Sequence, residues 1–194
     1  MKRIAVYCGS SCGIDNSYEE TAFMVGQTLA ARNIGLVYGG TNVGLMNAVA
    51  IGALSKKGEV IGVIPGFIRE RGLARPGLTR LLITETMHER KKTMSDLSDG
   101  FIALPGGFGT LEEFFEILTW GQLGLHKKPA GILNSRGFFD PLMDFIQKMV
   151  DEGFLKTSNQ EMLLLSDDIE DLLAKMESYI APSQGKWIFR DPVT

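Results

Sequence analysis

Six short segments of this chain are apolar along their whole length, and longer stretches with helical spacing separate most of them. A strand that is apolar on both sides needs cover on both faces, which is typical of a parallel sheet between two layers of helices. The sequence therefore predicts an α/β fold: a single Rossmann-like domain with a doubly wound parallel sheet and helices on both faces. The segments are residues 4–8, 34–40, 59–65, 101–107, 130–134 and 162–166.

The length of the chain, 194 residues, suits one ordinary domain with a core of its own. We expect this domain to span residues 1–180. Residues 181–194 are an irregular C-terminal tail, in which Trp187 and Phe189 indicate docking on a surface. Residues 66–80 are basic, contain Gly and Pro and have no clear period, so we expect either a mobile loop over a site or an ordinary surface connection.

Two capping boxes mark expected helix starts. Ser17 with Glu20, and Thr86 with Glu89, each match the pattern of a hydroxyl residue followed three positions later by an acid. Residues 43–58 have helical spacing and end in a glycine, which predicts a further helix.

Composition and charge argue against several kinds of function. The net charge of −3 disfavours a dedicated nucleic-acid surface, and no apolar run reaches the length of a signal peptide core or a membrane span. Cys8 and Cys12 are too few for a disulfide framework or a four-cysteine zinc site. His88 and His126, the only histidines, give little support to a histidine metal site or a Ser-His-Asp triad. We expect a soluble cytoplasmic protein with free thiols, no metal and no cofactor.

Three of the expected strands end in glycine-bearing turns, "CGSSCG", "YGGTNVG" and "PGGFGT". Because the carboxyl ends of parallel strands share one edge of the sheet, we expect these turns to bring backbone close to a ligand. The second turn contributes Gly39, Gly40 and Gly44 to the expected site. The chain has neither a P-loop nor the Gly-x-Gly-x-x-Gly spacing of a dinucleotide site, so an NAD enzyme is not expected.

The third turn carries the most specific signal. Pro105 ends a strand, and Gly106, Gly107 and Gly109 allow crowded or left-handed backbone before a helix that we expect to open at Thr110. The free amides at a helix start, with their partial positive charge, form an anion site that fits a phosphate. The glycines leave no Cβ in the path of that phosphate.

Glu113 follows Thr110 by three residues and shares its side of the first helical turn. An acid in a first turn often does no more than complement the helix dipole. Beside a bound phosphate, however, the carboxylate would point past it towards a ribose, where it could stabilise positive charge or orient a water. Both interpretations remain open at this stage.

Arg90 lies on an apolar stripe with Met87, Met94 and Leu97 rather than on the solvated face of its expected helix. A buried guanidinium without a partner is costly, so it forms a structural ion pair, extends its charge to solvent, or meets an anion at the site. That anion is either a phosphate or Glu113. Lys91 reaches the same place or stays solvated.

Three stretches, "PGGFGTLEE", "MHERKKTM" and "YGGTNVGLMNAVA", resemble the LOG (Lonely Guy) family of cytokinin riboside 5′-monophosphate phosphoribohydrolases, long mislabelled as lysine decarboxylases. The resemblance spans nearly the whole chain to about residue 180. It implies hydrolysis of the N-glycosidic bond of a nucleoside 5′-monophosphate to a free base and ribose 5-phosphate. It also implies a homodimer with the site close to the subunit interface.

The resemblance assigns the catalytic roles to Arg90 and Glu113. It assigns phosphate binding to the turn that precedes the helix of Glu113. The expected phosphate and substrate contacts are Gly39, Gly40, Gly44, Glu70, Met87, Lys91, Gly106, Gly107, Gly109 and Thr110.

Two departures from the family pattern concern substrate choice. Thr41 and Asn47 stand where the family usually has glycines, so crowding near the ribose or base could shift the preferred substrate. The acidic residue that contacts substrate in relatives, in the loop after Pro65, aligns ambiguously: Glu70 is the nearest candidate, and Gly72 could occupy the equivalent place.

Two alternatives belong to other functional classes. A non-catalytic nucleotide or molybdenum-cofactor carrier on the same fold would share a glycine-rich loop but would not need both Arg90 and Glu113. A pyridoxal-phosphate decarboxylase would need a Schiff-base lysine and a cofactor pocket, for which the sequence offers no argument.

Overall fold

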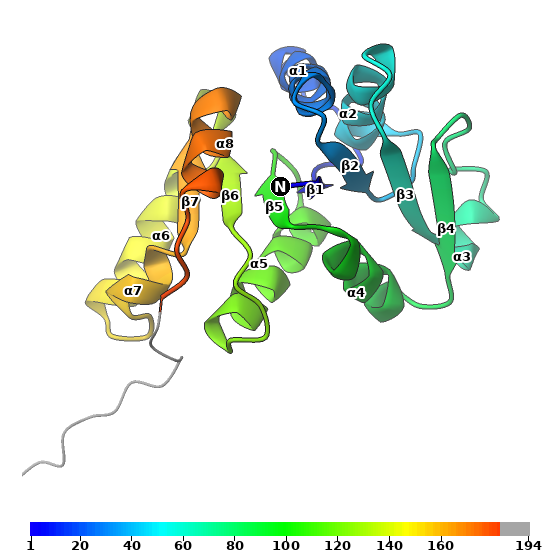
Figure 1. Cartoon of the computed structure of the whole chain (residues 1–194). Helices are drawn as coiled ribbons and strands as arrows, with labels where there is room; N and C mark the ends of the chain where they lie inside the picture. Colours follow the sequence, from blue (N-terminus) through cyan, green and yellow to red (C-terminus); the bar gives the residue numbers. More distant parts are fainter. Residues whose placement is uncertain (183–194) are drawn as a thin grey trace, which may run out of the picture.

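The computed structural model describes residues 1–182. Its centre is a seven-stranded sheet in which every pairing is parallel, with the strand order β4-β3-β2-β1-β5-β6-β7 (Figure 1). The expected tail, with Trp187 and Phe189, lies outside the described residues apart from residues 181 and 182. The strands are β1 (Arg3–Tyr7), β2 (Gly35–Tyr38), β3 (Val60–Pro65), β4 (Arg80–Thr84), β5 (Gly100–Ala103), β6 (Ala130–Leu133) and β7 (Leu163–Ser166).

Helices cover both faces of this sheet, as Figure 1 shows. One layer contains α1, α2 and α8, and the other contains α4, α5 and α6. The predicted doubly wound α/β fold is therefore confirmed. The helices are α1 (Ser17–Ala31), α2 (Gly44–Ser55), α3 (Gly66–Arg69), α4 (Met87–Leu97), α5 (Phe108–Gln122), α6 (Asp140–Asp151), α7 (Thr157–Gln160) and α8 (Ile169–Glu177), with a 3₁₀ turn η1 (Ser135–Gly137).

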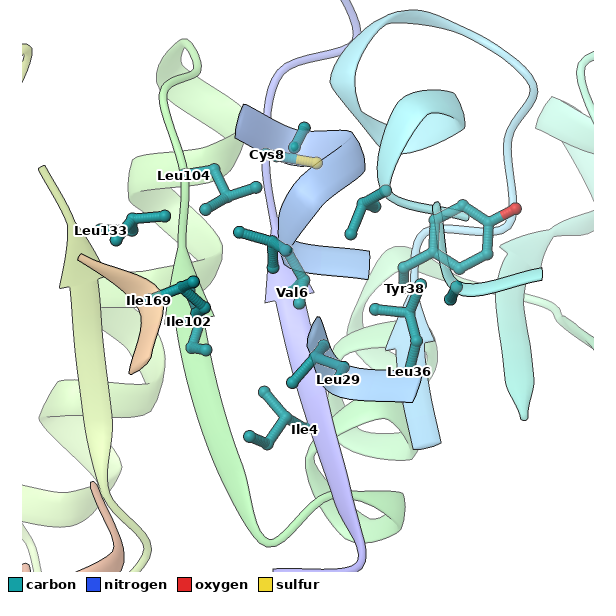
Figure 2. Close-up of a cluster of buried hydrophobic side chains, with 14 of the residues drawn as sticks. Ile4, Val6, Cys8, Leu29, Leu36, Tyr38, Ile102, Leu104, Leu133 and Ile169 are labelled. Atoms are coloured by element: carbon teal, nitrogen blue, oxygen red, sulfur yellow. The ribbon is translucent and has the colours of Figure 1, made fainter. Parts of the chain in front are cut away.

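Alternating side chains of the central strand β1 fill the two cores. Ile4 and Val6, with Cys8 directly after the strand, belong to the cluster under α1, α2 and α8, which Figure 2 shows in close-up. Ala5 and Tyr7 belong to the cluster under α4, α5 and α6. Because both sets are buried, the strand reads as apolar throughout, which is the pattern that predicted it.

The edge strand β4 was not predicted. Arg80 and Ile83 are exposed, two further residues are only partly buried, and, among the described residues, β3 is the one strand that pairs with it. Residues 66–80, expected to be a loop, contain the short helix α3 and end where β4 begins. An edge strand needs less apolar sequence than a central one, so its pattern is weak.

Helix starts differ in one case from the capping pattern. Thr86 caps α4, since its hydroxyl accepts a hydrogen bond from the Glu89 amide at 3.1 Å. Ser17 does not cap α1: the helix begins at Ser17 itself, Asn16 is the cap, and the Ser17 amide donates to Asp15 Oδ1 at 2.9 Å. The Ser17–Glu20 capping box was therefore wrong by one position.

The winding of the sheet sets the position of the site. Strands β2, β3 and β4 follow one another on one side of β1, and β5, β6 and β7 follow one another on its other side. The order therefore reverses between β1 and β5. Ligands of open α/β sheets bind in the crevice at such a switch point, outside the carboxyl ends of the strands. No helix among residues 1–182 is long and apolar enough to cross a membrane.

Candidate active site at the switch point

The three glycine-bearing turns meet at the switch point, as the sequence predicted. The Gly9 amide, after β1, donates to the Pro105 carbonyl, after β5, at 3.0 Å. The Leu45 amide at the start of α2 donates to the Gly9 carbonyl, also at 3.0 Å. Gly44 has a φ of 56°, and a Cβ there would lie 2.3 Å from the Ser10 carbonyl carbon. Glycine at position 44 is thus required for the turns to pack together.

A pocket of about 270 Å³ opens beside these turns, close to the lower end of the range for small-molecule sites. Elements from both sides of the switch point and from α2 and α4 contribute to it. It is lined by Cys8, Gly9, Ser10, Met46, Met87, Arg90, Gly107, Phe108, Gly109, Thr110, Glu112 and Glu113.

A second hollow of about 320 Å³ borders this pocket and shares Gly9, Ser10 and Gly107 with it. Tyr18 and Phe138 form its aromatic wall, with their rings edge to face at a centroid distance of 5.8 Å. The two hollows together extend along the crevice between the turns after β1 and β5.

The amino end of α5 faces the pocket without a side-chain cap. Gly107 is the N-cap residue, Phe108 is the first helical residue and Thr110 the third, so the helix begins two residues earlier than expected. A Cβ at Gly107 or at Gly109 would have no atom within 4 Å. Packing within the chain therefore does not require glycine at either position. A ligand that approaches the backbone closely would require it, because a Cβ would occupy the same space.

Gly106 plays a different part from the two glycines after it. A Cβ on Gly106 would lie 2.1 Å from Thr110 Oγ1 and 2.9 Å from the Gly9 amide nitrogen. These distances are too short for any side chain, so this glycine lets the turn close on the first turn of α5 and on the turn after β1. Thr110 is itself buried, at 4% exposure.

Arg90 and Glu113 form an ion pair at the floor of the pocket, with Arg90 Nη1 2.6 Å from Glu113 Oε1. Their side chains are only 8% and 10% exposed. Arg90 Nε also donates to the Val63 carbonyl of β3 at 3.0 Å. A Cβ on Gly39 would lie 2.2 Å from Arg90 Nη2, so glycine at position 39 makes room for the guanidinium.

Burial and the neighbouring charge act in opposite directions on the pKa of Glu113. Burial raises the pKa of Glu113 above its ordinary value of 4.5, and the Arg90 charge acts in the opposite direction and favours the carboxylate. Burial also raises the pKa of the Cys8 thiol at the same pocket, so Cys8 stays protonated and is a poor nucleophile. The charged side chains that line the pocket are the Arg90–Glu113 ion pair and Glu112.

Lys91 lies next to the pocket but does not line it. Its Nζ forms ion pairs with Glu112 and, at 3.1 Å, with Glu116 of α5, and the side chain is 7% exposed. The interpretation of Lys91 as a solvated side chain, which the sequence left open, is therefore wrong. Lys91 joins α4 to α5 directly behind the Arg90–Glu113 pair.

The pocket also gathers residues that the sequence did not single out. Met46 of α2 and Phe108 of α5 line it with the expected Met87. Met46 follows the glycine-bearing turn after β2, and its placement depends on how that turn folds back over β1. Spacing along the chain carries no signal for such a contact.

Glu70 does not reach this pocket. It is exposed and follows α3 as the C-cap residue, and its amide donates to the Gly66 carbonyl at 2.9 Å. Gly72, the other candidate, has a φ of 75°, and a Cβ there would have no atom within 4 Å. The expected substrate contact in this loop is thus not brought to the pocket by either residue.

Gly40 likewise serves packing rather than the pocket surface. It has a φ of 73°, and a Cβ there would lie 3.2 Å from the Ile64 side chain. Among residues 1–182, no group of three or more His, Cys, Asp or Glu side chains is placed to hold a metal ion.

The fold and the pocket define a doubly wound α/β protein whose site combines an uncapped helix amino end with a buried arginine–glutamate pair at the switch point. The family model described as possible lysine decarboxylase matches residues 46–176. The cytokinin riboside 5′-monophosphate phosphoribohydrolase LOG1 of Arabidopsis thaliana is 42% identical over 180 residues, covering 93% of this chain and 84% of that protein. The chain belongs to this family, the LOG family.

A second relative supports the family, and solved structures share the fold. A probable cytokinin riboside 5′-monophosphate phosphoribohydrolase, LOGL2 of Oryza sativa subsp. japonica, is 44% identical over 179 residues, which are 92% of this chain and 73% of that protein. The molybdenum cofactor binding protein of Rippkaea orientalis has the same fold, with a TM-score of 0.70, 22% identity and coverage of 92% and 97% of the two chains. The molybdenum cofactor carrier protein of Chlamydomonas reinhardtii gives a TM-score of 0.68 at 19% identity, covering 90% and 95%.

Proposed function

We propose that this protein is a phosphoribohydrolase that cleaves the N-glycosidic bond of a nucleoside 5′-monophosphate. The substrate is AMP or an N6-modified adenine nucleotide such as a cytokinin nucleotide, and the products are the free base and ribose 5-phosphate. Relatives more than 40% identical over nine-tenths of the chain carry the name of this activity. The observation that carries the proposal is the Arg90–Glu113 pair beside the uncapped amino end of α5.

In the proposed reaction the 5′-phosphate binds at the amino end of α5, among Gly107, Gly109 and Thr110. Backbone amides and the helix dipole supply the positive potential, and the missing Cβ atoms at positions 107 and 109 leave the space that a phosphate needs. Glu113 lies one turn further along the same helix. The sugar of a nucleotide anchored this way extends towards its carboxylate.

Bond cleavage is proposed to be dissociative. The C1′–N bond breaks with its electron pair leaving on the base, and positive charge grows on C1′ and the ring oxygen. The Glu113 carboxylate stabilises this charge and orients a water, whose oxygen then bonds to C1′. The water gives up one proton, and the departing base takes one up.

Arg90 is proposed to act on Glu113. Burial alone favours a neutral glutamic acid, which could neither stabilise a cation nor orient water for attack. The guanidinium at 2.6 Å keeps the carboxyl group charged, and its bond to the Val63 carbonyl fixes its own position. The pair therefore holds an ionised carboxylate that is largely buried yet lines the pocket.

We also propose a cytoplasmic homodimer whose active site lies near the subunit interface. Phe108, at the rim of the pocket, is 93% exposed, and a second copy of the chain would cover it. Light scattering tests this assembly, since a dimer has twice the 21.3 kDa mass of the chain. A mass of one chain at micromolar concentration would contradict it.

The test of the activity is a rate series on purified protein with AMP, GMP, CMP and isopentenyl-AMP, with the free base measured by chromatography. Release of base from an adenine nucleotide, with an equal amount of ribose 5-phosphate, is the expected result. Failure to release base from any of them would favour a nucleotide or cofactor carrier. An absorbance scan separates the decarboxylase alternative, which requires a bound pyridoxal chromophore.

A further inference from the structure

Asn47 and Arg75 join two segments near the pocket: helix α2, which contributes Met46 to the lining, and the loop that contains Arg75. The Arg75 guanidinium donates through Nη1 to Asn47 Oδ1, on the first turn of α2. The Arg75 amide donates to the Gly40 carbonyl at 3.0 Å, so the main chain and the side chain of Arg75 both hold α2 and the turn before it. Sequence alone gave no reason to connect residues so far apart.

The same contact includes the neighbouring residues of both segments. The Asn42 amide donates to the Leu73 carbonyl at 2.9 Å, and Thr41 forms an isolated antiparallel bridge with Ala74. Residues 73–75 are therefore tied along residues 40–42. The loop that the sequence left as either mobile or ordinary is fastened here to the turn between β2 and α2.

Met46 connects this contact to the pocket. It is the neighbour of Asn47 in the chain and lines the pocket, and the Thr41 hydroxyl donates to its sulfur at 3.5 Å. A Cβ on Gly39 would lie 2.8 Å from the Met46 sulfur, so the thioether is closely confined. Any movement of the first turn of α2 would move this wall of the pocket.

The wall that contains Met46 is the one left for the base. In the proposed reaction, which this inference takes as its basis, the phosphate lies at the amino end of α5 and the sugar faces Glu113. The remaining apolar lining of the pocket includes Met46 and Met87. Polarisable thioethers make favourable contacts with flat aromatic rings, as a purine requires.

The guanidinium of Arg75 has few hydrogen-bond partners. Its Nε atom is buried and has no hydrogen-bond partner among the described residues, so Asn47 Oδ1 is the side-chain acceptor that holds the guanidinium. Removing that acceptor would leave more of a partly buried cation unpaired, which favours a different position of the arginine.

We infer that Asn47 and Arg75 are positioning residues that fix the Met46 wall of the pocket and thereby set the affinity for the base of the nucleotide. They act through Met46 and the turn at residues 40–42. Their loss should weaken the binding of ligands that carry a base and spare ligands that consist of the sugar phosphate alone.

The test is equilibrium binding of AMP and of ribose 5-phosphate by calorimetry to Asn47→Ala, Arg75→Ala and the double variant, each made in the Glu113→Gln protein so that AMP is not consumed during the titration. Arg71→Ala is the matched control, because Arg71 is an exposed arginine of the same loop. We expect AMP to bind about 10-fold more weakly to each single variant. The double variant should bind AMP as weakly as the single variants and no more weakly, because residues in contact show coupling of this size. Ribose 5-phosphate binding and the Arg71→Ala control should be unchanged.

Equal weakening of AMP and ribose 5-phosphate would overturn the inference, because it would indicate general disruption of the site. Normal AMP affinity in both single variants, or additive losses in the double variant, would also overturn it while the unaltered protein still releases base from AMP. If the unaltered protein neither binds nor hydrolyses any nucleotide, the proposed function itself fails, and this inference fails with it.

Discussion

The side chains of Arg90 and Glu113 meet inside the protein, with Nη1 and Oε1 2.6 Å apart and exposures of only 8% and 10%. The two residues come from different helices, α4 and α5, which cover the same face of the sheet. A buried pair of this kind is weak evidence for stability, because desolvation offsets much of the attraction. Its position in the pocket at the switch point supports the functional role proposed for it.

Breaking the pair should destabilise the fold more than replacing it. Arg90→Met leaves the Glu113 carboxyl group buried without its counter-charge, so we expect the free energy of unfolding to fall by about 3–5 kcal/mol. The double variant Arg90→Met with Glu113→Leu should recover most of this loss, since neither charge remains. Urea denaturation at neutral pH measures both. Additive losses in the double variant would show that the two charges do not interact.

Arg90 should also be needed for turnover. Arg90→Ala removes the charge that keeps Glu113 ionised, and we expect kcat for base release from AMP to fall by at least about 100-fold. Arg90→Lys keeps a charge but loses the forked geometry that reaches both Glu113 and the Val63 carbonyl, so it should recover only part of the rate. Near-normal kcat in Arg90→Ala would contradict the role given to this pair.

The pH dependence of activity should show a limb on the acid side. Burial raises the pKa of Glu113 above 4.5, and the reaction needs the carboxylate, so kcat should decline as the pH falls through this raised value. Compared with an exposed glutamate, the limb should lie at higher pH. A profile that stays flat down to the ordinary pKa of glutamate would show that Glu113 does not titrate in the reacting complex.

The titration of Glu113 affects stability in the opposite direction to activity: activity is lost as the pH falls, whereas this contribution to stability is lost as the pH rises. A glutamate whose pKa is raised in the folded state binds its proton more tightly there than in the unfolded chain. Its contribution is therefore fully present below the unfolded pKa and is lost as the pH rises through the folded pKa. We expect the stability of the unaltered protein relative to Glu113→Gln to fall as the pH rises through that window, measured by urea denaturation at several pH values.

The glycines of the turn before α5 should separate into two kinds. Gly107→Ala and Gly109→Ala add a methyl group that meets no atom within 4 Å, so the fold should keep its stability while phosphate-bearing ligands bind more weakly. Gly106→Ala would place its Cβ 2.1 Å from Thr110 Oγ1 and should destabilise the protein. Thermal melting and ribose 5-phosphate binding distinguish the two. A stable Gly107→Ala protein with normal ribose 5-phosphate affinity would argue against the proposed phosphate position.

Much of the fold was predictable because burial on both faces leaves a direct mark on a sequence. Strands β1, β2, β3, β5, β6 and β7 all lie within or across the apolar segments. Strand β7 is also at an edge but has no exposed residue, whereas the edge strand β4 was missed because its residues include the exposed Arg80 and Ile83. With these two residues exposed, the sequence of β4 does not differ clearly from that of a surface loop.

The residues of the candidate site could be proposed from the sequence where they sit on one element and less readily where several elements meet. The turn before α5 and Glu113 are neighbours in the chain, and Arg90 was conspicuous because a charge lay on an apolar stripe. Met46 and the Asn47–Arg75 contact depend on how a turn and a loop fold over one another. The burial of Lys91 depends on two acids of a helix that follows it in the chain, which spacing within its own helix does not reveal.

The most direct test of the account is the rate of adenine release from AMP by Glu113→Gln and by the unaltered protein at neutral pH. Glutamine keeps the size of the side chain and removes its charge, and binding of ribose 5-phosphate to the variant controls for an intact site. We predict that the variant releases adenine at least about 100-fold more slowly while it binds ribose 5-phosphate normally. Equal rates in the two proteins would contradict the role of the buried carboxylate.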